Sequence, residues 1–442
     1  MSEVHPIGGQ LGRGVGWGVV TDLEIRLITL GDDFEAQLDL GQRAFGVYSA
    51  QHRASWLHAA RLRASQGLFL GAFTGRTPVG AAMLHDMRQY WLGQPVGCAG
   101  VAAVKVAPEY RGRGIGRRLM TELLHLIEAK GYPLSALYPA TMPIYRSLGW
   151  ELAGARHRFT VPARSLLALR EPGAAARGGG ADHRDVTIRR AGPADAATVV
   201  GIIGDSHRAA RDSGPVTWDE GPAAEWLGRE NLYTYLAGHA AGHAAGHAGH
   251  AGHAGDTGHG GFAAYEWDGG DLWVERVHAR SPETLWALWS VIASHGSIAD
   301  NVIGITAPAD PFWWLTRECD ATVTHRAMWM LRIVDIRAAI AARGFPAAVA
   351  VSVPLEVRDQ ARPGNAGSWQ LTVTNGTGTL TQNEGVSSPV PLQLGPRGVA
   401  ALYAGTPLAA LRLAGLASGG SPDADAALDA AFAATPYMLD EF

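Results

Sequence analysis

The spacing of hydrophobic residues predicts a strand, a helical stretch and a hairpin at the start of the folded chain. Leu23, Ile25 and Leu27 alternate with charged residues, which is the period of a β-strand. Residues 32–66 carry apolar positions within a polar stretch and are predicted to be helical. Two apolar runs then flank a turn at Gly75, which is typical of a β-hairpin.

A strand, a loop and a helix follow the hairpin. Residues 97–106 predict a strand that runs into Pro108, and residues 134–138 predict another strand. Between them, apolar residues recur at every fourth position, which predicts an amphipathic helix with Ile115, Leu119, Leu123 and Ile127 on one face. A Gly- and Arg-rich loop therefore joins a strand to a helix.

Changes in composition divide the chain into three domains. Residues 1–20 are Gly-rich and are predicted to form a flexible tail, and residues 166–184 have the Gly/Ala/Arg composition of a linker. Beyond the linker, a strand and a helix cap restart and echo the opening of the chain, which indicates a second copy of the same fold. We expect a first domain at 21–165, a second at 185–327 and a third at 328–442, where strand-like alternation precedes Ala/Leu-rich helices.

The second domain contains a Gly-His-Ala repeat at residues 238–260. Histidine-rich tracts can bind metal ions, but this Gly/Ala spacing fixes no ligand geometry. The repeat is therefore interpreted as an expanded surface loop, and no metal is expected.

Composition and charge exclude several classes of protein. The 442 residues include 47% hydrophobic and 18% charged residues, which is enough to bury a core in each of two to four domains. The net charge of -4 gives no basic surface for nucleic acid. Cys98 and Cys319 are too few and too far apart for a disulfide framework, which favours a reducing compartment. No apolar run is long enough to span a membrane, and the N-terminus lacks a signal-peptide pattern.

The loop between strand and helix has the features of a phosphate-binding site. Gly112, Gly114 and Gly116 let the backbone approach a ligand closely. Free N–H groups and the positive end of the helix dipole favour a pyrophosphate. Arg113 and Arg117 add positive charge beside it. A Gly-rich turn that binds nothing is the alternative.

The familiar nucleotide motifs do not fit this loop. It lacks the Gly-Lys-Ser/Thr of a Walker loop, and Glu128 lies within the predicted helix, whereas a Rossmann fingerprint needs an acidic residue closing a second strand. The loop instead resembles that of the GNAT acetyltransferase superfamily, with matches at Arg111, Gly114 and Gly116. The resemblance implies that acetyl-CoA is the co-substrate and is bound by Val104, Lys105, Val106, Arg111, Gly112, Arg113, Gly114, Ile115, Gly116, Arg117, Ala140 and Thr141.

Acetylation of an amine needs a base for the ammonium and an acid for the leaving thiolate. The resemblance places a tyrosine acid at Tyr145, and a phenol with a pKa near ~10 suits that role. The alternative is that Tyr145 only packs. Tyr138 is disfavoured because Pro139 follows it at a strand end. His85, His125 and Glu109 are candidate bases by residue type alone, and His125 is expected on the polar face of its helix.

More of the chain resembles the Eis (enhanced intracellular survival) family. The matching segments lie at 104–114, 131–140, 144–150 and 331–340, together with the C-terminal residues 437–442. The resemblance implies an α+β chain of tandem GNAT folds followed by a sterol-carrier-like domain. It also implies that the second fold has lost its cofactor loop, and residues 285–300 indeed contain no Arg-x-x-Gly-x-Gly.

The same resemblance supplies expectations about function. The C-terminal carboxylate of Phe442 would be the base and Tyr145 the acid. Aminoglycoside-type polyamines would be acetylated, at several positions where the cleft is wide, and the chain would form a cytoplasmic homohexamer. Secretion without a recognisable signal peptide is left open.

An acidic and aromatic cleft would suit a polycationic acceptor. The sequence offers as lining residues Phe45, Trp56, Trp91, Asp33 and Glu35. Two other functions stay open, namely acetylation of protein lysines and a lipid-binding or scaffold role with a vestigial cofactor site.

Overall fold

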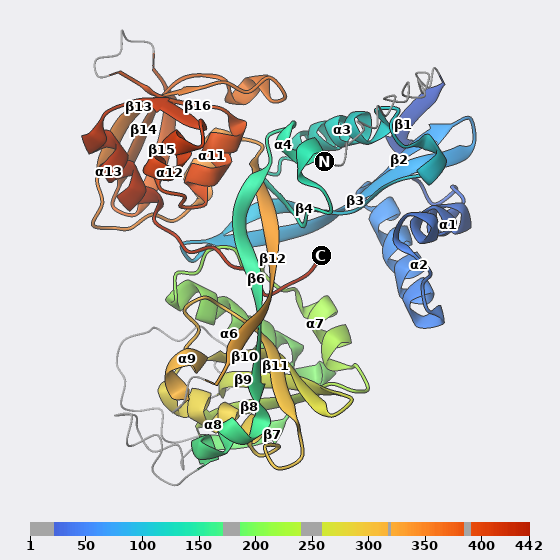
Figure 1. Ribbon diagram of the computed structural model, residues 1–442, viewed down its shortest axis with the longest axis vertical. Coiled ribbons are helices and arrows are strands. Elements are labelled where there is room, and N and C mark those ends of the chain that lie inside the picture. Colours follow the sequence, from blue (N-terminus) through green and yellow to red (C-terminus); the bar gives the residue numbers. More distant parts are fainter. Residues whose placement is uncertain (1–21, 171–185, 240–258, 317–319, 384–389) are drawn as a thin grey trace, which may run out of the picture. The chain divides into compact units, whose positions relative to one another are not determined.

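A computed structural model describes residues 22–170, 186–239, 259–316, 320–383 and 390–442 (Figure 1). The predicted flexible tail at 1–20, most of the linker and residues 240–258 of the His-rich repeat lie outside the described residues. The chain divides into two compact units. The first contains the residues up to Leu84 and Ala102–His125, and the second contains His85–Val101 and Leu126–Phe442.

The first unit carries the predicted strand and hairpin. Strand β1 (Leu23–Leu27) pairs antiparallel with β2 (Phe69–Thr74), and β2 pairs antiparallel with the start of β3 (Thr77–Trp91). The predicted helical stretch forms two helices, α1 (Phe34–Phe45) and α2 (Ala50–Ser65). They are separated at Gly46, whose φ of 103° ends α1 because a residue with a Cβ rarely adopts it.

Capping and burial explain why these segments fold as they do. The carboxylate of Asp33 accepts hydrogen bonds from the first N–H groups of α1, and Ser49 does the same for α2. The two helices cover the strands around one apolar core, whose buried members include Ile28, Phe34, Leu40, Ala60, Phe69, Phe73, Ala81 and Met83.

The second unit is built on one long sheet in the order β4-β5-β12-β6-β11-β10-β9-β8-β7. Its central strands, β6 and β12, run antiparallel beside each other over most of their length (Figure 1). The strands are β4 (Gln94–Val106), β5 (Leu134–Leu137), β6 (Glu151–Pro162), β7 (Val186–Arg190), β8 (Tyr233–His239), β9 (His259–Asp268), β10 (Asp271–Ala279), β11 (Asn301–Thr306) and β12 (Thr322–Ile333).

Helices alternate with these strands along the chain. The predicted amphipathic helix is α3 (Ile115–Ala129), and all four of its apolar positions are buried. The strand and helix predicted after the linker are β7 and α6. The other helices along the sheet are α4 (Met142–Arg146), α6 (Ala196–Ala209), α7 (Glu220–Leu227), α8 (Pro282–Ala293) and α9 (Phe312–Leu315).

The third domain has its own sheet, in the order β15-β14-β13-β16-β17. The strand-like alternation predicted there forms β13 (Val351–Val357), β14 (Gly367–Thr374) and β15 (Thr377–Gln382). The remaining elements are α10 (Ile336–Ala342), β16 (Leu392–Leu394), α11 (Pro396–Tyr403), α12 (Leu408–Leu413), β17 (Ala417–Gly419) and α13 (Pro422–Phe432). The boundary predicted between 327 and 328 lies inside β12, because alternation along a strand does not mark where a domain ends.

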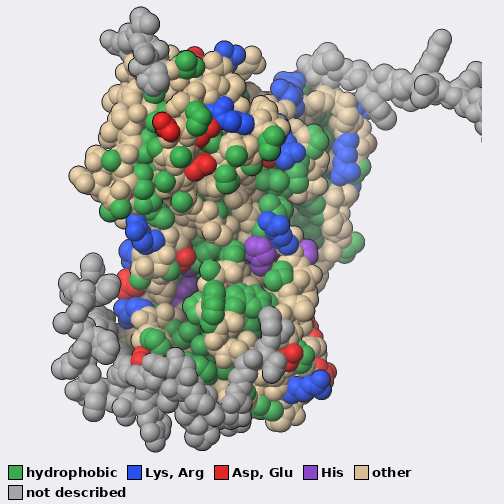
Figure 2. All heavy atoms as spheres, turned by 60° about the vertical axis from the view of Figure 1, so that its left-hand side comes forward, with side chains coloured by type: hydrophobic (Ala, Val, Ile, Leu, Met, Phe, Trp, Pro, Cys, Tyr) green, Lys and Arg blue, Asp and Glu red, His purple; other side chains and the backbone are tan. Residues whose placement is uncertain are grey.

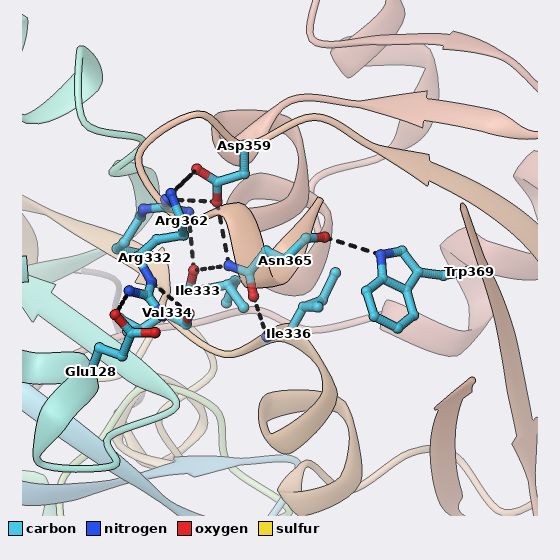
Figure 3. A network of polar contacts seen from close by, with 9 residues as sticks. All are labelled: Glu128, Arg332, Ile333, Val334, Ile336, Asp359, Arg362, Asn365 and Trp369. Atoms are coloured by element: carbon cyan, nitrogen blue, oxygen red, sulfur yellow. Dashed lines mark hydrogen bonds and ion pairs between the residues drawn. The ribbon is translucent and has the colours of Figure 1, made fainter. Parts of the chain in front are cut away.

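A buried polar network joins β12 to the third domain (Figure 3). Arg332 donates hydrogen bonds to both carboxylate oxygens of Asp359, at 2.8 and 2.7 Å, and both side chains are 1% exposed. Asn365 bridges the N–H of Ile336 and the carbonyl of Ile333. Removing one partner of the buried ion pair would leave the other charge without a partner, so the network holds the start of the third domain against β12.

Three features bear on membranes, metals and disulfides. Within the described ranges, no helix is long and apolar enough to cross a membrane. The same residues contain no group of three or more His, Cys, Asp or Glu side chains placed to hold a metal ion. Cys98 is a buried free thiol, and burial raises its pKa, whereas Cys319 lies outside the described residues.

Candidate functional site

The glycine-rich loop has the backbone geometry that an anion site at a helix start requires. Gly112 and Gly114 have φ angles of 76° and 78°, which side chains with a Cβ rarely adopt. The first hydrogen bond within α3 runs from the N–H of Arg118 to the carbonyl of Gly114, at 3.1 Å. The N–H groups of Ile115 and Gly116 come earlier, in the first turn of the helix, where N–H groups have no acceptor within the helix. The loop can therefore present N–H donors and a positive dipole end to a phosphate.

Arginine side chains brace this loop from within the first unit. The Nε of Arg111 donates to the carbonyl of Val106 at 3.3 Å, which ties the loop back to the end of β4. Arg113 lies over the ring of Tyr110, at 5.2 Å from its centroid. Beside the helix start, a hollow of about 460 Å³ is lined by Ile25, Arg117, Arg118, Thr121 and Glu122.

Strand β4 runs on past its ladder with β5. The parallel ladder pairs Cys98–Val101 of β4 with Leu134–Leu137 of β5, and β4 continues to Val106. Ala103 has a φ of 51°, an uncommon value for a residue with a Cβ, which kinks the strand after the ladder. The backbone of Val104–Val106 follows this kink, and it is the segment expected to pair with the arm of the co-substrate.

The side chain of Lys105 is buried between β4 and the helices of the first unit. Its Nζ donates to the carbonyl of Gln37 in α1 at 3.0 Å and lies 4.6 Å from the ring centroid of Trp56 in α2. Burial lowers the pKa of Lys105 to about 8. The side chain therefore ties both helices to the strand, and the expected co-substrate contact falls to its backbone.

Tyr145 is a buried residue of the short helix α4, in the second unit. Its side chain is 6% exposed and lies edge-on to Trp150, with ring centroids 6.5 Å apart. Burial raises the pKa of Tyr145, so the phenol keeps its proton at neutral pH. Ala140 and Thr141, the other expected contacts beyond β5, are exposed just before α4.

The candidate bases by residue type have different surroundings. His125 is exposed and lies 3.6 Å from Glu122, as its place on the polar face predicts. Glu109 is exposed and forms an ion pair with Arg43 at 2.7 Å; its pKa is lowered by a hydrogen bond from its own backbone and then by Arg43. His85 is half-buried, and its ring centroid lies 6.4 Å from that of Phe442.

The C-terminal tail is ordered within the second unit. Tyr437 and Met438 are buried, and the N–H of Met438 donates to the carbonyl of Ala155 at 3.2 Å, next to a parallel bridge between Ala155 and Tyr437. The ring of Phe442 packs near Tyr138, with centroids 5.5 Å apart. The tail therefore forms a short extension of the sheet beside β6, and its last residue is half-buried.

A glycine on β4 makes room for the last residue. A Cβ on Gly100 would lie 2.9 Å from the Cδ2 of Phe442 and 3.1 Å from the Cε of Met87. The ring of Phe442 therefore fits against β4 because residue 100 has no side chain.

Two residues expected in the acceptor cleft have structural roles instead. Trp91 is fully buried in the core, edge-on to Tyr403 with ring centroids 4.8 Å apart, so it lines no cleft. Asp33 is the N-cap of α1, with its carboxylate used by backbone N–H groups. The residue type alone does not show whether an aspartate caps a helix or lines a cleft, or whether a tryptophan lies in a core or lines a cleft. Phe45 is 54% exposed, and Glu35 pairs with Arg53 on the surface.

Sequence reasoning missed the residues that hold the tail. Arg276 and Trp218 of the second domain bond the carboxylate of Asp440, and Arg156 of β6 contacts Leu439 and Glu441. These partners are separated by more than 160 residues of sequence from the tail. No local motif could have identified them.

Comparisons with known proteins match the three-part order. The sequence model of an acetyltransferase (GNAT) domain matches residues 24–153, and a second acetyltransferase (GNAT) domain model matches 225–333. The model of a sterol carrier protein domain matches residues 336–439. The tandem GNAT folds and the sterol-carrier domain are thus as the resemblance implied.

Similar proteins come from several bacteria. The N-acetyltransferase Eis of Mycobacterium tuberculosis is 30% identical over 300 residues, which cover 66% of this chain and 69% of that protein. A GCN5-related N-acetyltransferase from Kribbella flavida is 42% identical, with a TM-score of 0.84 over 95% of this chain and 98% of that one. Eis1 from Mycobacterium abscessus, at 21% identity and a TM-score of 0.70 over 95% of this chain and 100% of that one, shares the fold.

The sequence models, the relatives and the geometry agree on the kind of enzyme. GNAT acetyltransferases use acetyl-CoA, and a loop with two positive-φ glycines at a helix start suits its pyrophosphate. The chain is therefore an acyltransferase, and it belongs to the Eis family of GNAT N-acetyltransferases.

Proposed function

We propose that this N-acetyltransferase transfers acetyl groups from acetyl-CoA to the amines of cationic, aminoglycoside-type polyamines, at more than one position. The single observation that carries the proposal is the ordered C-terminus, because a chain end used as a base has to be held in one place. Met438 is 0% exposed and Phe442 packs near Tyr138. The negative charge of the terminal carboxylate favours a polycationic acceptor.

The glycine-rich loop and the end of β4 bind the co-substrate in this proposal. The N–H groups at the start of α3 bind the pyrophosphate, with Arg113 and Arg117 supplying charge. The backbone of Val104–Val106 pairs with the pantetheine arm and directs an N–H at the thioester carbonyl. A donor at that point stabilises the tetrahedral intermediate that forms when the amine attacks directly.

Two residues move the protons in this proposal. The carboxylate of Phe442 orients the attacking amine in its neutral form, or a water that takes up its proton, because a free α-carboxyl with a pKa of ~3.3–3.7 is a weak base by itself. Tyr145 gives its proton to the leaving thiolate. The raised pKa of its buried phenol supports this role, because the phenol stays protonated until a strong base forms beside it.

Self-association as a homohexamer is part of the proposal. Exposed hydrophobic residues of the second domain support it, since Trp314 and Ile298 are each 73% exposed and Val323 is 54% exposed. The face in Figure 2, which brings the side of α9 forward, shows hydrophobic side chains gathered over the lower part. Size-exclusion chromatography coupled to light scattering measures the mass of the assembly. The mass of a monomer alone would contradict the hexamer.

The activity test follows thiol release from acetyl-CoA with tobramycin as acceptor. Purified protein with a native C-terminus is compared with Tyr145→Phe and with a chain lacking Phe442, and the product is weighed by mass spectrometry. We expect a gain of two or more acetyl masses, and a loss of about 10²–10⁴-fold in kcat for Tyr145→Phe, as is usual for a general acid.

The outcomes separate the parts of the proposal. Full activity without Phe442 would exclude the tail as base and keep the acetyltransferase. Acetylation of a lysine-containing peptide in preference to tobramycin would replace the acceptor class. Binding of acetyl-CoA without transfer to any amine would contradict the proposed reaction.

A further inference from the structure

The acidic residue two positions before the chain end is clamped by the second domain. The guanidinium of Arg276, on β10, forms an ion pair with Oδ1 of Asp440, and the indole Nε1 of Trp218 donates to the same oxygen at 3.0 Å. Arg276 also lies over the ring of Trp218, at 4.7 Å from its centroid. One carboxylate oxygen therefore receives two donors that also contact each other.

This clamp is largely withdrawn from water. The side chain of Arg276 is 6% exposed and that of Asp440 is 13% exposed. An ion pair at this depth is costly to break on one side only, because the remaining charge stays buried without a partner. The clamp therefore resists the fraying that is usual at a chain end.

Two glycines provide the space through which the tail reaches the clamp. A Cβ on Gly154 of β6 would collide with the backbone of Pro436, and a Cβ on Gly214 would collide with the backbone of Tyr437. Gly214 also has a φ of 110°, which disfavours any other residue. The path of the tail is thus set by backbone contacts before Asp440 is reached.

We propose that Arg276 and Trp218 are positioning residues for the acetyl transfer, which hold Asp440 so that the carboxylate of Phe442 stays in one place. This inference rests on the proposed role of Phe442. It also gives the second domain, which has no cofactor loop of its own, a part in the reaction. Arg276 and Trp218 touch neither reacting group and act only through the tail.

The test compares Arg276→Gln, Arg276→Lys and Arg412→Gln with the wild-type chain. Arg412 is the control because it also forms an ion pair with an aspartate, Asp425, at 2.7 Å in the third domain. We measure kcat, KM for acetyl-CoA, and the rate at which carboxypeptidase A releases Phe442 from the folded protein. We expect Arg276→Gln to lower kcat at least tenfold and to release phenylalanine at least tenfold faster, with KM for acetyl-CoA unchanged. Arg276→Lys restores part of both, and Arg412→Gln changes neither.

A double-variant cycle separates positioning from general damage. In a chain lacking Phe442, Arg276→Gln causes no further loss of kcat if it acts through the tail, whereas damage to the fold would add to the loss. If Arg276→Gln does not fold, Trp218→Phe keeps the aromatic ring and removes the indole donor, and it is judged by the same measurements.

The outcomes also distinguish this inference from the proposed function. Wild-type release of phenylalanine together with wild-type kcat in Arg276→Gln and Trp218→Phe overturns the positioning role. Faster release in these variants, combined with full activity of the chain lacking Phe442, would instead show that the tail is held but is not the base. That result would overturn the proposed role of Phe442 as the base, and with it the role of Arg276 and Trp218 in the reaction.

Discussion

The hydroxyl of Tyr138 donates a hydrogen bond of 2.7 Å to the backbone carbonyl of Asp440, 302 residues later in the chain. Tyr138 directly follows β5, and burial raises the pKa of its phenol, so the hydroxyl keeps the proton that it donates. The two tyrosines near the end of β5 therefore have different surroundings. Tyr138 is bonded to the tail, and Tyr145 is packed against Trp150.

Removing each hydroxyl should have a different result. We expect Tyr138→Phe to lower kcat moderately and to speed the release of Phe442 by carboxypeptidase A, because the tail loses one anchor. Tyr145→Phe should lower kcat more and leave release of Phe442 unchanged, because its hydroxyl acts as the acid. Equal release rates for Tyr138→Phe and the wild-type chain would show that this hydrogen bond does not hold the tail.

The loop glycine at the start of α3 should matter to the co-substrate as well as to stability. Gly114→Ala introduces a Cβ at a φ of 78°, a strain of roughly 1–2 kcal/mol, and should also weaken acetyl-CoA binding at least tenfold. Gly75→Ala is the control, since Gly75 has a φ of 57° in the β2–β3 turn, and a Cβ at either position meets no atom within 4 Å. Isothermal calorimetry measures the affinity. Equal losses of affinity in both variants would contradict a specific role for the loop.

Burial of Lys105 should make stability depend on pH. Its pKa is about 8 in the folded chain and 10.5 as the ordinary value, so the unfolded chain binds more protons between these pH values. The contribution of neutral Lys105 to the free energy of unfolding is complete above pH 10.5, and it is lost as the pH falls through 8. Lys105→Met should have a higher free energy of unfolding than the wild-type chain at pH 8. This difference should shrink by on the order of 1–3 kcal/mol from pH 8 to pH 10.

Urea unfolding at several pH values measures this difference. The control is Lys130→Met, which removes an exposed lysine in place of a buried one. A pH-independent difference between the wild-type chain and Lys105→Met would show that Lys105 titrates normally when the protein is folded.

The buried pair in Figure 3 should be costlier to break than a more exposed pair in the third domain. Asp359→Asn leaves the charge of Arg332 buried, because no water reaches a side chain that is 1% exposed, and should cost about 3–5 kcal/mol. The control Asp425→Asn removes the partner of Arg412, whose side chain is 31% exposed, and should cost about 1 kcal/mol or less. Urea denaturation followed by tryptophan fluorescence measures both. Similar costs for the two variants would contradict the role of burial.

Local patterns predicted most elements of the fold. The alternation of Leu23, Ile25 and Leu27 became β1, and the apolar positions of residues 115–127 became the buried face of α3. These predictions succeed because strand and helix periods are fixed by the backbone. The break at Gly46 was missed, since a glycine within a helical pattern can equally continue the helix.

The candidate site was predictable only where it is local. The sequence by itself determined the loop of residues 111–117. Its three glycines lie close together in the sequence, between a strand and a helix, so a local pattern is enough to identify it. It also supplied the family resemblance that the comparisons bear out. The tertiary structure alone decided that Trp91 belongs to a core, that Lys105 is buried, and that Arg276 meets Asp440. Such contacts depend on which distant strands pair, and neither residue of a long-range pair carries a local sign of its partner.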